Sequence, residues 1–324
     1  MNILIISTDK KVFEPKSEVR LRIYDYASEV GNLFVVTLGN NRGLEMEGHI
    51  KFLGLSRWRA FFWQPKEKYD LVTSQDPFET GLIARRLAKI LGAQLELQIH
   101  TDIGSYYFRR ESLKNRFRFF LARLLLPKAD KIRVVSQRIK NYLVSNLGIA
   151  ESKIYVKPIF VDIEKIKQTP ITIDLRKKYP QFDQIILMAS RLTKEKNIGL
   201  AIEAMREVVK QKPKTGLVIA GSGSEEKSLK LKTKSYKLEV TVVFEPWINH
   251  ETLVSYYKTC DLFLLTSWYE GYGMTLVEAQ AAGCKIVSTD VGVARGLVEN
   301  DKSGFIVLAG NPNQLSRAIK QALS

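Results

Sequence analysis

The stretch Leu262-Phe-Leu-Leu-Thr-Ser-Trp-Tyr-Glu-Gly-Tyr-Gly-Met-Thr-Leu-Val-Glu-Ala-Gln-Ala-Ala-Gly283 carries the clearest indication of the fold of this 324-residue chain. Its first four residues form a short apolar run, typical of a strand in a parallel sheet that is buried on both faces. A glycine-rich turn follows at 270–275, and the spacing then predicts a helix over 276–282. Because the N–H groups that open a helix are unpaired and carry partial positive charge, this turn suits an anionic ligand.

The alternation of strand and helix continues on both sides of this stretch. We predict strands at 2–7, 33–38, 50–55, 71–74, 95–99, 132–136 and 154–156, and again at 185–189, 217–220, 240–244, 262–265, 285–288 and 305–307. Helices are expected at 18–30, 79–91, 113–126, 138–147, 198–211, 225–234, 250–259, 275–282 and 312–323. Such alternation implies parallel sheets covered on both faces. The polar segment 160–181 separates two sets, so we expect an α/β chain of two Rossmann-like, doubly wound domains, 1–165 and 166–324.

The composition is that of an ordinary globular protein. Hydrophobic residues make up 45% and charged residues 26%, enough for two cores. No apolar run approaches the roughly 20 residues that span a bilayer, and the N-terminus lacks the basic region and cleavage site of a signal peptide. Two cysteines far apart in sequence and three scattered histidines favour a reducing cytoplasm and argue against a structural zinc.

The net charge of +16 is unevenly distributed. Residues 103–140 hold eleven Lys and Arg against two acids, which predicts an anionic partner. In the helix expected there, one apolar stripe is predicted to face the core, and Phe119 and Leu126 to point outwards between Arg116 and Arg123. The stripe consists of Leu113, Phe117, Phe120, Leu121 and Leu124. We expect this helix to lie on an anionic membrane, or else to be buried on both sides. Nucleic acid is not expected, since no aromatic and basic residues interleave on a strand.

Two turns in the second domain carry candidate ligand-binding residues. Open α/β sheets bind ligands at the carboxyl ends of their strands. Arg191 and Lys196 follow a predicted strand and could grip a diphosphate, although a solvated loop is the alternative. Gly221 follows the next strand, where it either lets the backbone approach a ligand or makes an ordinary tight turn.

Two glutamates flank the glycine-rich turn of the opening stretch. Glu270 precedes the turn and Glu278 lies about one helical turn inside the helix, so they are not an acid and base paired on one helix face. We expect Glu270 to meet uncharged hydroxyl groups and Glu278 to accept a hydrogen bond from a ribose. A solvated glutamate is the alternative for either residue, but the flanking Gly271, Gly273 and Gly283 favour a site.

The motif Ser-x-x-Glu-Gly-x-Gly-x-x-x-x-Glu-Ala-x-Ala-x-Gly over 267–283 resembles the signature of glycosyltransferase family 4. The resemblance extends to 190–197, 220–223, 256–261 and 291–304, and so covers essentially all of the second domain. It implies a GT-B fold, in which two Rossmann-like domains face a central cleft. It also implies transfer of a sugar with retention of the anomeric configuration.

The resemblance assigns roles to individual residues. Arg191 and Lys196 match the cationic pair that stabilises the departing diphosphate, Glu270 the residue that contacts the donor sugar, and Glu278 the ribose ligand. Backbone N–H groups of the glycine-rich turn would hold phosphate, at Gly271, Gly273, Met274 and Thr275. The two cations do the work of a metal in this family, and no Asp-x-Asp motif is evident, so no metal or other cofactor is expected beyond a UDP- or GDP-linked donor.

The first domain matches the family less closely. His100 ends a predicted strand and is similar to the family's histidine near the donor sugar, while Asp76 and Asp102 are candidate acceptor contacts. A structural histidine, and for Asp76 a helix cap, are the alternatives. The family's glycine-rich loop after the first strand is here 8–20, without glycine; either Ser17 and the helix after it replace that loop, or the loop stays mobile until donor binds. Family members also continue beyond the position of Leu323, so the chain is either truncated or less firmly locked between domains.

Together these features predict a retaining, metal-independent, hexosyltransferase-type glycosyltransferase. Its acceptor would be a lipid-linked or cell-surface glycan precursor, and it would be cytoplasmic, peripheral on the inner face of the plasma membrane. The alternatives are a catalytically silent protein that binds nucleotide sugar or nucleic acid, or another GT-B enzyme such as an epimerase. The sequence leaves the donor base, the sugar, the acceptor, the linkage and the oligomeric state open.

Overall fold

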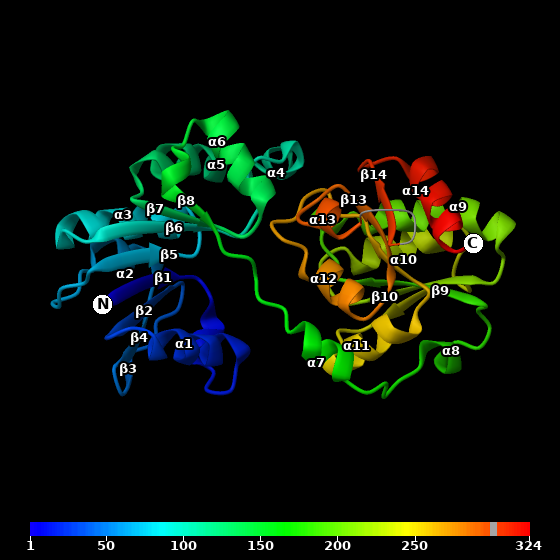
Figure 1. Cartoon of the computed structure of the whole chain (residues 1–324), viewed down its shortest axis with the longest axis horizontal. Coiled ribbons are helices and arrows are strands. Elements are labelled where there is room, and N and C mark those ends of the chain that lie inside the picture. Colours follow the sequence, from blue (N-terminus) through cyan, green and yellow to red (C-terminus); the bar gives the residue numbers. More distant parts are fainter. Residues whose placement is uncertain (299–302) are drawn as a thin grey trace. The chain divides into compact units, whose positions relative to one another are not determined.

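The computed structural model describes residues 1–298 and 303–324. They form two compact units, Met1–Pro158 and Ile159–Ser324 (Figure 1). The expected linker at 160–181 belongs to the second unit, where it holds the short helices α7 (Ile163–Gln168) and α8 (Leu175–Lys178). These form because Ile166 and Leu175 are buried while an aspartate caps each helix. Residues 299–302 of the 291–304 motif lie outside the described residues.

The first unit is built on an eight-stranded sheet in the order β3-β4-β2-β1-β5-β6-β7-β8. Its strands are β1 (Ile3–Ser7), β2 (Leu33–Leu38), β3 (Leu44–Glu47), β4 (Ile50–Leu55), β5 (Leu71–Ser74), β6 (Gln94–Ile99), β7 (Lys131–Val134) and β8 (Ile154–Val156). The expected parallel pairing is confirmed for all pairs except β3 with β4, where an antiparallel edge strand that the sequence did not predict is added. Glu47 pairs with Ile50 across a two-residue turn, and Gly48 at φ 58° lets the chain reverse there.

Helices flank this sheet on both faces (Figure 1). They are α1 (Glu18–Ser28), α2 (Arg57–Phe62), α3 (Glu79–Leu91), α4 (Tyr106–Glu111), α5 (Leu113–Leu125) and α6 (Gln137–Leu147), with 3-10 turns η1 (Lys10–Phe13), η2 (Leu126–Lys128) and η3 (Glu151–Lys153). The consecutive β1 residues Ile3 and Leu4 point to opposite faces, and both are fully buried. The sheet is therefore covered on both faces, as the continuous apolar run predicts.

The second unit is a six-stranded parallel sheet in the order β11-β10-β9-β12-β13-β14. The strands are β9 (Gln184–Ala189), β10 (Thr215–Ala220), β11 (Val242–Glu245), β12 (Leu262–Leu265), β13 (Lys285–Thr289) and β14 (Gly304–Val307). The chain winds outwards from β9 on one side and from β12 on the other, so the strand order reverses between these two. The loops after β9 and β12 therefore leave the sheet side by side at the switch point, where such folds bind ligands.

Two hydrophobic clusters hold this second sheet. The helices are α9 (Ile198–Gln211), α10 (Glu226–Ser235), α11 (His250–Thr259), α12 (Met274–Ala281), α13 (Ala294–Leu297) and α14 (Pro312–Ala322), with the 3-10 turn η4 (Lys194–Lys196). Ile186 and Met188 of β9 pack with α9 and α14, whereas Ile185 and Leu187 pack with α11 and α12. Because β9 is anchored on both faces, the loop that follows it leaves from a rigid base.

Candidate active site

Lys196 and Glu270 join the two loops at the switch point. They lie 74 residues apart in sequence, yet Lys196 Nζ donates to Glu270 Oε1 at 2.5 Å. Both side chains are largely buried, at 14% and 15% exposure. Ser267 Oγ donates to the same carboxylate oxygen at 2.7 Å. The expected ligand-binding lysine and glutamate are thus brought together, as an ion pair.

Backbone contacts fasten the same two loops. Thr266 Oγ1, directly after β12, lies 3.0 Å from the carbonyl oxygens of Lys196 and Asn197 and donates to them. The Trp268 N–H donates to the Glu195 carbonyl at 2.8 Å. The position of Lys196 relative to Glu270 is therefore determined by several contacts and does not depend on the ion pair alone.

Arg191 lies in the same loop as Lys196 but is open to solvent. Its side chain is 67% exposed, and Nη2 lies 3.0 Å from Glu195 Oε1. Thr193 Oγ1 donates to the same carboxylate oxygen at 2.7 Å. The Glu195 side chain is largely buried, at 14% exposure, but the Arg191 guanidinium is open to water, which screens the pair, so the guanidinium can leave Glu195 for a more highly charged anion.

The glycines after β10 have a structural explanation. Gly221 has φ 149°, and a Cβ there would lie 1.9 Å from the Ser190 carbonyl oxygen. A Cβ on Gly223 would lie 2.3 Å from the Leu192 carbonyl oxygen. The Leu192 N–H donates to the Ser222 carbonyl at 2.9 Å. The loop after β10 therefore packs against the loop after β9, which requires glycine whether or not Gly221 also contacts a ligand.

Helix α12 is preceded by a glycine, which cannot cap it with a side chain. Gly273 is the N-cap at φ 93° and, as a glycine, has no side chain to accept from the first N–H groups. Met274 is 39% exposed, Thr275 is half-buried and Gly271 is buried. A Cβ on Gly292 would lie 2.1 Å from the Tyr272 carbonyl oxygen. The loop after β13, which contains Gly292, therefore packs against the turn. Within the described residues no side chain caps this helix, so its first N–H groups are available to an anion.

Glu278 has its hydrogen-bonding partners on helix α11. It is buried, Oε2 accepts a hydrogen bond from Tyr257 at 3.1 Å, and Oε1 lies 3.4 Å from His250 Nε2. Burial, and secondarily the Glu278 charge, raise the pKa of Tyr257 well above its ordinary value, so the phenol stays protonated and donates. Both carboxylate oxygens thus face α11, and the ribose role of Glu278 stays a prediction. Sequence reasoning missed both partners, because nothing in the spacing shows that α11 packs on α12.

His100 directly follows β6 in the first unit. Its Nε2 lies 3.1 Å from Gln98 Oε1. His100 is exposed to solvent by its surface area, but protein atoms gathered around the ring desolvate it. This desolvation, and then the charges of Arg133 and Arg22, lower the pKa of His100 to about 4. The imidazole is therefore neutral at pH 7 and can offer one donor and one acceptor to a sugar hydroxyl.

The other first-unit candidates hold local turns. Asp76 Oδ1 accepts from the Phe78 N–H at 2.8 Å, and Asp102 Oδ1 from the Gly104 N–H at 3.1 Å. Burial raises the pKa of Asp76. Ser17 caps α1, accepting at 3.1 Å from the N–H of Arg20. These bonds explain each residue without a ligand, and their donor and acceptor roles stay predictions.

The expected orientation of α5 is wrong. Leu113, Phe117, Phe120 and Leu124, which were expected in the core, are 78%, 57%, 56% and 46% exposed. Leu126, which was expected outside, is fully buried, and Phe119 is half-buried. The physical reason is that α5 packs on α3 through its smaller side: Ala122 and Leu125 are buried, and Leu125 Cδ1 would lie 3.4 Å from a Cβ on Gly81. Hydrophobicity alone did not distinguish the two faces.

The structure contains neither a membrane span nor a metal cluster in the part it describes. No helix within residues 1–298 and 303–324 is long and apolar enough to cross a bilayer. Over the same residues, no group of three or more His, Cys, Asp or Glu side chains is placed to hold a metal ion. Metal independence stays a prediction.

Comparison with known proteins gives consistent similarities over both units. The family model described as Glycosyl transferases group 1 matches residues 173–324, and the model Glycosyltransferase Family 4 matches 22–165. The chain is 30% identical, over 73% of its length, to N-acetylgalactosamine-N,N'-diacetylbacillosaminyl-diphospho-undecaprenol 4-alpha-N-acetylgalactosaminyltransferase of Campylobacter jejuni, and spans 63% of that protein. It is 26% identical, over 87% of its length and 72% of the relative, to the UDP-Gal:alpha-D-GlcNAc-diphosphoundecaprenol alpha-1,3-galactosyltransferase of Escherichia coli.

Solved structures share the fold over the whole chain. Sucrose-phosphate synthase from Thermosynechococcus elongatus superposes with a TM-score of 0.79 at 19% identity, covering 100% of this chain and 90% of that one. Anabaena HepE in complex with UDP and glucose gives a TM-score of 0.75 at 20% identity, with the same coverage.

Proposed function

Because the chain belongs to glycosyltransferase family 4, with the two Rossmann-like domains of the GT-B fold, we propose that it transfers a sugar from a nucleoside-diphosphate sugar to a hydroxyl group of a lipid-linked glycan precursor. The observation that carries this proposal is the meeting of Lys196 and Glu270 at the switch point of the second sheet. The acceptor class follows the printed names of the two relatives, both of which act on diphospho-undecaprenol-linked sugars. The donor class follows HepE, which was solved with UDP.

The cations stabilise the leaving group in this reaction. The bond between the anomeric carbon and the diphosphate oxygen breaks with both electrons on oxygen, and the acceptor oxygen bonds to that carbon on the same face. The acceptor proton passes to the departing phosphate. Lys196 and Arg191 meet the negative charge that develops, so we propose that the transfer needs no metal ion. Once Lys196 turns to the diphosphate, Glu270 is free to accept hydrogen bonds from sugar hydroxyls.

We also propose that α5 holds the protein at an anionic membrane surface. Its exposed residues Leu113, Phe117, Phe120 and Leu124 recur at three- or four-residue spacing along one helix face, and Lys114, Arg116 and Arg123 on the same helix are exposed. An amphipathic helix of this kind buries its apolar face at the level of the headgroups, where cations meet anionic lipids. Such a position would bring the enzyme to a lipid-linked acceptor.

A donor screen followed by product analysis tests the proposed transfer. UDP- and GDP-linked sugars should be compared for thermal stabilisation, since a ligand at 100 times its dissociation constant stabilises by about 2.7 kcal/mol. The donor so found is then incubated with undecaprenyl-diphosphate-linked sugars, and the anomeric configuration of the product is read by NMR. Absence of stabilisation by every nucleotide sugar would overturn the proposal, and an inverted product would overturn retention.

A further inference from the structure

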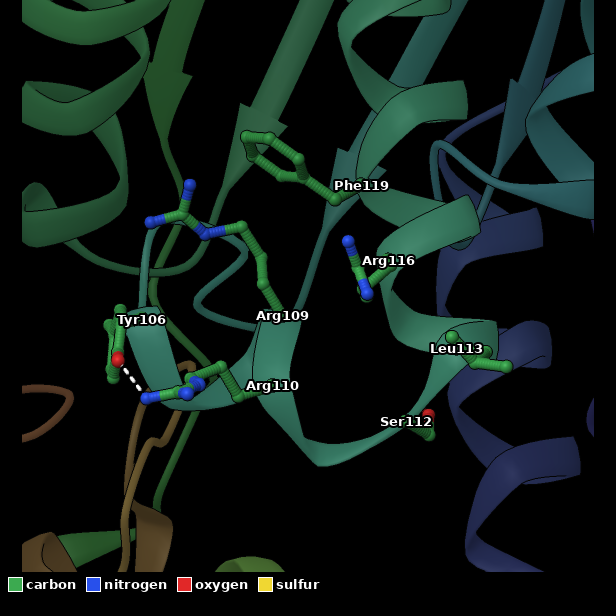
Figure 2. Close-up of a pocket in the computed structure, with 7 residues that line it drawn as sticks. All are labelled: Tyr106, Arg109, Arg110, Ser112, Leu113, Arg116 and Phe119. Atoms are coloured by element: carbon green, nitrogen blue, oxygen red, sulfur yellow. Dashed lines mark hydrogen bonds between the residues drawn. The ribbon is translucent and has the colours of Figure 1, made fainter.

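A cationic pocket lies between α4 and α5 of the first unit, outside the residues discussed above as donor site. Its volume is about 820 Å³. In Figure 2, Arg109 extends from α4 towards the Phe119 ring, Arg110 turns to Tyr106, and Arg116 projects from α5 on the side of α4. The lining residues are Tyr106, Arg109, Arg110, Ser112, Leu113, Arg116 and Phe119. Sequence reasoning found the basic segment but not this concavity, because it had no expectation of α4.

Arg109 has an unmet hydrogen-bonding requirement here. Its Nε atom is buried and, among the described residues, has no hydrogen-bond partner. The guanidinium carbon lies 5.0 Å from the centre of the Phe119 ring, which orients the group without accepting its N–H. A buried donor without an acceptor costs about 1–3 kcal/mol, so the arrangement favours a ligand that brings acceptor atoms.

The other two arginines add further positive charge to the pocket. Arg110 donates to the hydroxyl of Tyr106, and Arg116 extends from α5 into the pocket (Figure 2). Within the part of the chain that the structure describes, no carboxylate forms an ion pair with Arg109, Arg110 or Arg116. Three guanidinium groups around one space match an anion with many acceptor oxygens, and their planar forks suit phosphate.

The apolar side of the same pocket limits the kind of phosphate compound. Leu113 lines the pocket and is also the first residue of the exposed α5 stripe, which continues through Phe117. A ligand whose charged headgroup lies in the pocket could therefore place an apolar chain along Leu113 and Phe117. The volume of about 820 Å³ exceeds what a single phosphate fills and lies in the usual range of organic-ligand pockets.

We propose that this pocket binds the diphosphate of the lipid-linked acceptor, with the arginines on the phosphate oxygens and the start of the lipid chain along Leu113 and Phe117. The proposal rests on the proposed function for its choice of lipid. It gives the acceptor a binding site on the first unit, separate from the Lys196 and Glu270 site of the second.

Calorimetric titration of the full chain with geranyl diphosphate tests the proposal. Arg109→Gln and Arg116→Gln should each weaken binding about tenfold, the loss expected for one charge-assisted hydrogen bond. Arg123→Gln is the matched control, because Arg123 is exposed on the same helix and does not line the pocket. It should change binding less than about twofold, because water and salt screen an exposed charge that lies outside the pocket. Arg116 is itself exposed, so its variant keeps the fold; binding unchanged in Arg116→Gln would overturn the proposal.

Two further probes identify the source of the phosphate. Inorganic pyrophosphate should bind more weakly than geranyl diphosphate, and Leu113→Ser should remove that difference. Equal binding of the two compounds would overturn the lipid part of the proposal. Lys196→Gln should lose donor affinity and keep geranyl diphosphate binding. If geranyl diphosphate binding instead depends on Lys196 and not on the arginines, the pocket fails while the donor site stands; if the arginines bind it but no nucleotide sugar binds, the proposed function fails while the pocket stands.

Discussion

At the scale of single residues, Arg191 differs from Lys196 in exposure. Because Arg191 is 67% exposed and only weakly paired, its removal should leave stability nearly unchanged and act on the reaction. Arg191→Ala should lower turnover by a factor on the order of 10² to 10³, with a smaller loss of donor affinity, since charge on the diphosphate grows as the bond breaks. Arg191→Lys should stay impaired, because an ammonium lacks the planar fork. Steady-state turnover with matched calorimetry measures both effects. Near-normal turnover of Arg191→Ala, or loss of wild-type activity in EDTA, would contradict the metal-free mechanism.

Lys196 should affect stability as well as turnover. Its replacement by Ala leaves the largely buried Glu270 without its cation, which should cost about 1–3 kcal/mol in the free energy of unfolding. Lys194→Ala, in the same loop but exposed, is the control and should change stability by less than about 0.5 kcal/mol. Urea denaturation followed by circular dichroism makes the comparison. Equal effects of the two variants would mean that the ion pair does not contribute to the free energy of unfolding.

His100 makes stability depend on pH in a definite direction. Its pKa falls from the ordinary 6.5 to about 4 in the folded chain, so between these values the unfolded chain binds more protons than the folded one. The wild type should therefore lose stability as pH falls from about 6.5 towards 4, with no contribution from this group above 6.5. His100→Asn should remove that part of the loss. Urea midpoints at pH 7.5 and pH 5 test this, and an equal drop in wild type and variant would assign the pH dependence to other groups.

At the scale of helices, strands and loops, the α5 face can be tested with vesicles. Wild-type protein should sediment with anionic liposomes and less with neutral ones, and added salt should weaken binding as it screens the cations. Replacing Phe117 and Phe120 by Ser should reduce the salt-resistant part of binding, because that part comes from apolar burial. Equal recovery with neutral and anionic vesicles at all salt concentrations would remove the electrostatic component.

The contact between the β9 and β10 loops predicts a severe effect of one methyl group. Gly221→Ala places a Cβ against the Ser190 carbonyl at a φ of 149°, and should destabilise the second unit by about 2–4 kcal/mol. Gly296→Ala is the matched control in the same unit, because nothing lies within 4 Å of a Cβ there. Thermal denaturation of both variants measures the difference. If Gly221→Ala is as stable as the control, the loops do not pack as described.

Sequence patterns located the central elements well and the peripheral ones poorly. The predicted bounds of β2, β4, β5 and β12 coincide with the observed ones. In β2 and β12 every residue is buried, so each is an almost continuous apolar run with clear ends. The edge strand β3 carries two glutamates in four residues and was missed. Short helices such as α4 and α8 span six and four residues, too few for a helical period to show.

For the candidate site, the sequence predicted the residues but not the contacts between them. Lys196 and Glu270 could be found because each lies in the loop after a well-marked strand, and parallel strand ends meet at one edge. That the two form an ion pair depends on the distance between loops 74 residues apart, which sequence does not contain. The contacts of Glu278 with Tyr257 and His250, and the direction in which α5 faces, depend likewise on how helices pack.

At the scale of the whole molecule, each unit has its own sheet and its own buried core. The described residues show no helix able to span a membrane, and the chain carries a net charge of +16, so its attraction to anionic surfaces should be strongly salt-dependent.

This two-unit construction predicts how ligands change thermal unfolding. Calorimetry should resolve two transitions, because each unit can unfold by itself. A nucleotide sugar should raise the transition of the second unit, and geranyl diphosphate that of the first. Second-unit variants such as Gly221→Ala identify which transition is which. A donor that shifts only the first-unit transition would contradict the assignment of the donor site.

The Lys196 and Glu270 pair has a consequence for selectivity in a cell that contains abundant free monosaccharides. The Glu270 carboxylate, which the proposed function assigns to the sugar, is paired with the ammonium group of Lys196. A free sugar offers hydroxyls but no negative charge that would draw the ammonium away, whereas under the proposed function a nucleotide sugar would bring its diphosphate and release the carboxylate as it binds. Under the proposed function, glucose or galactose alone should therefore bind weakly, because a diphosphate has to displace Lys196 before the sugar can reach Glu270.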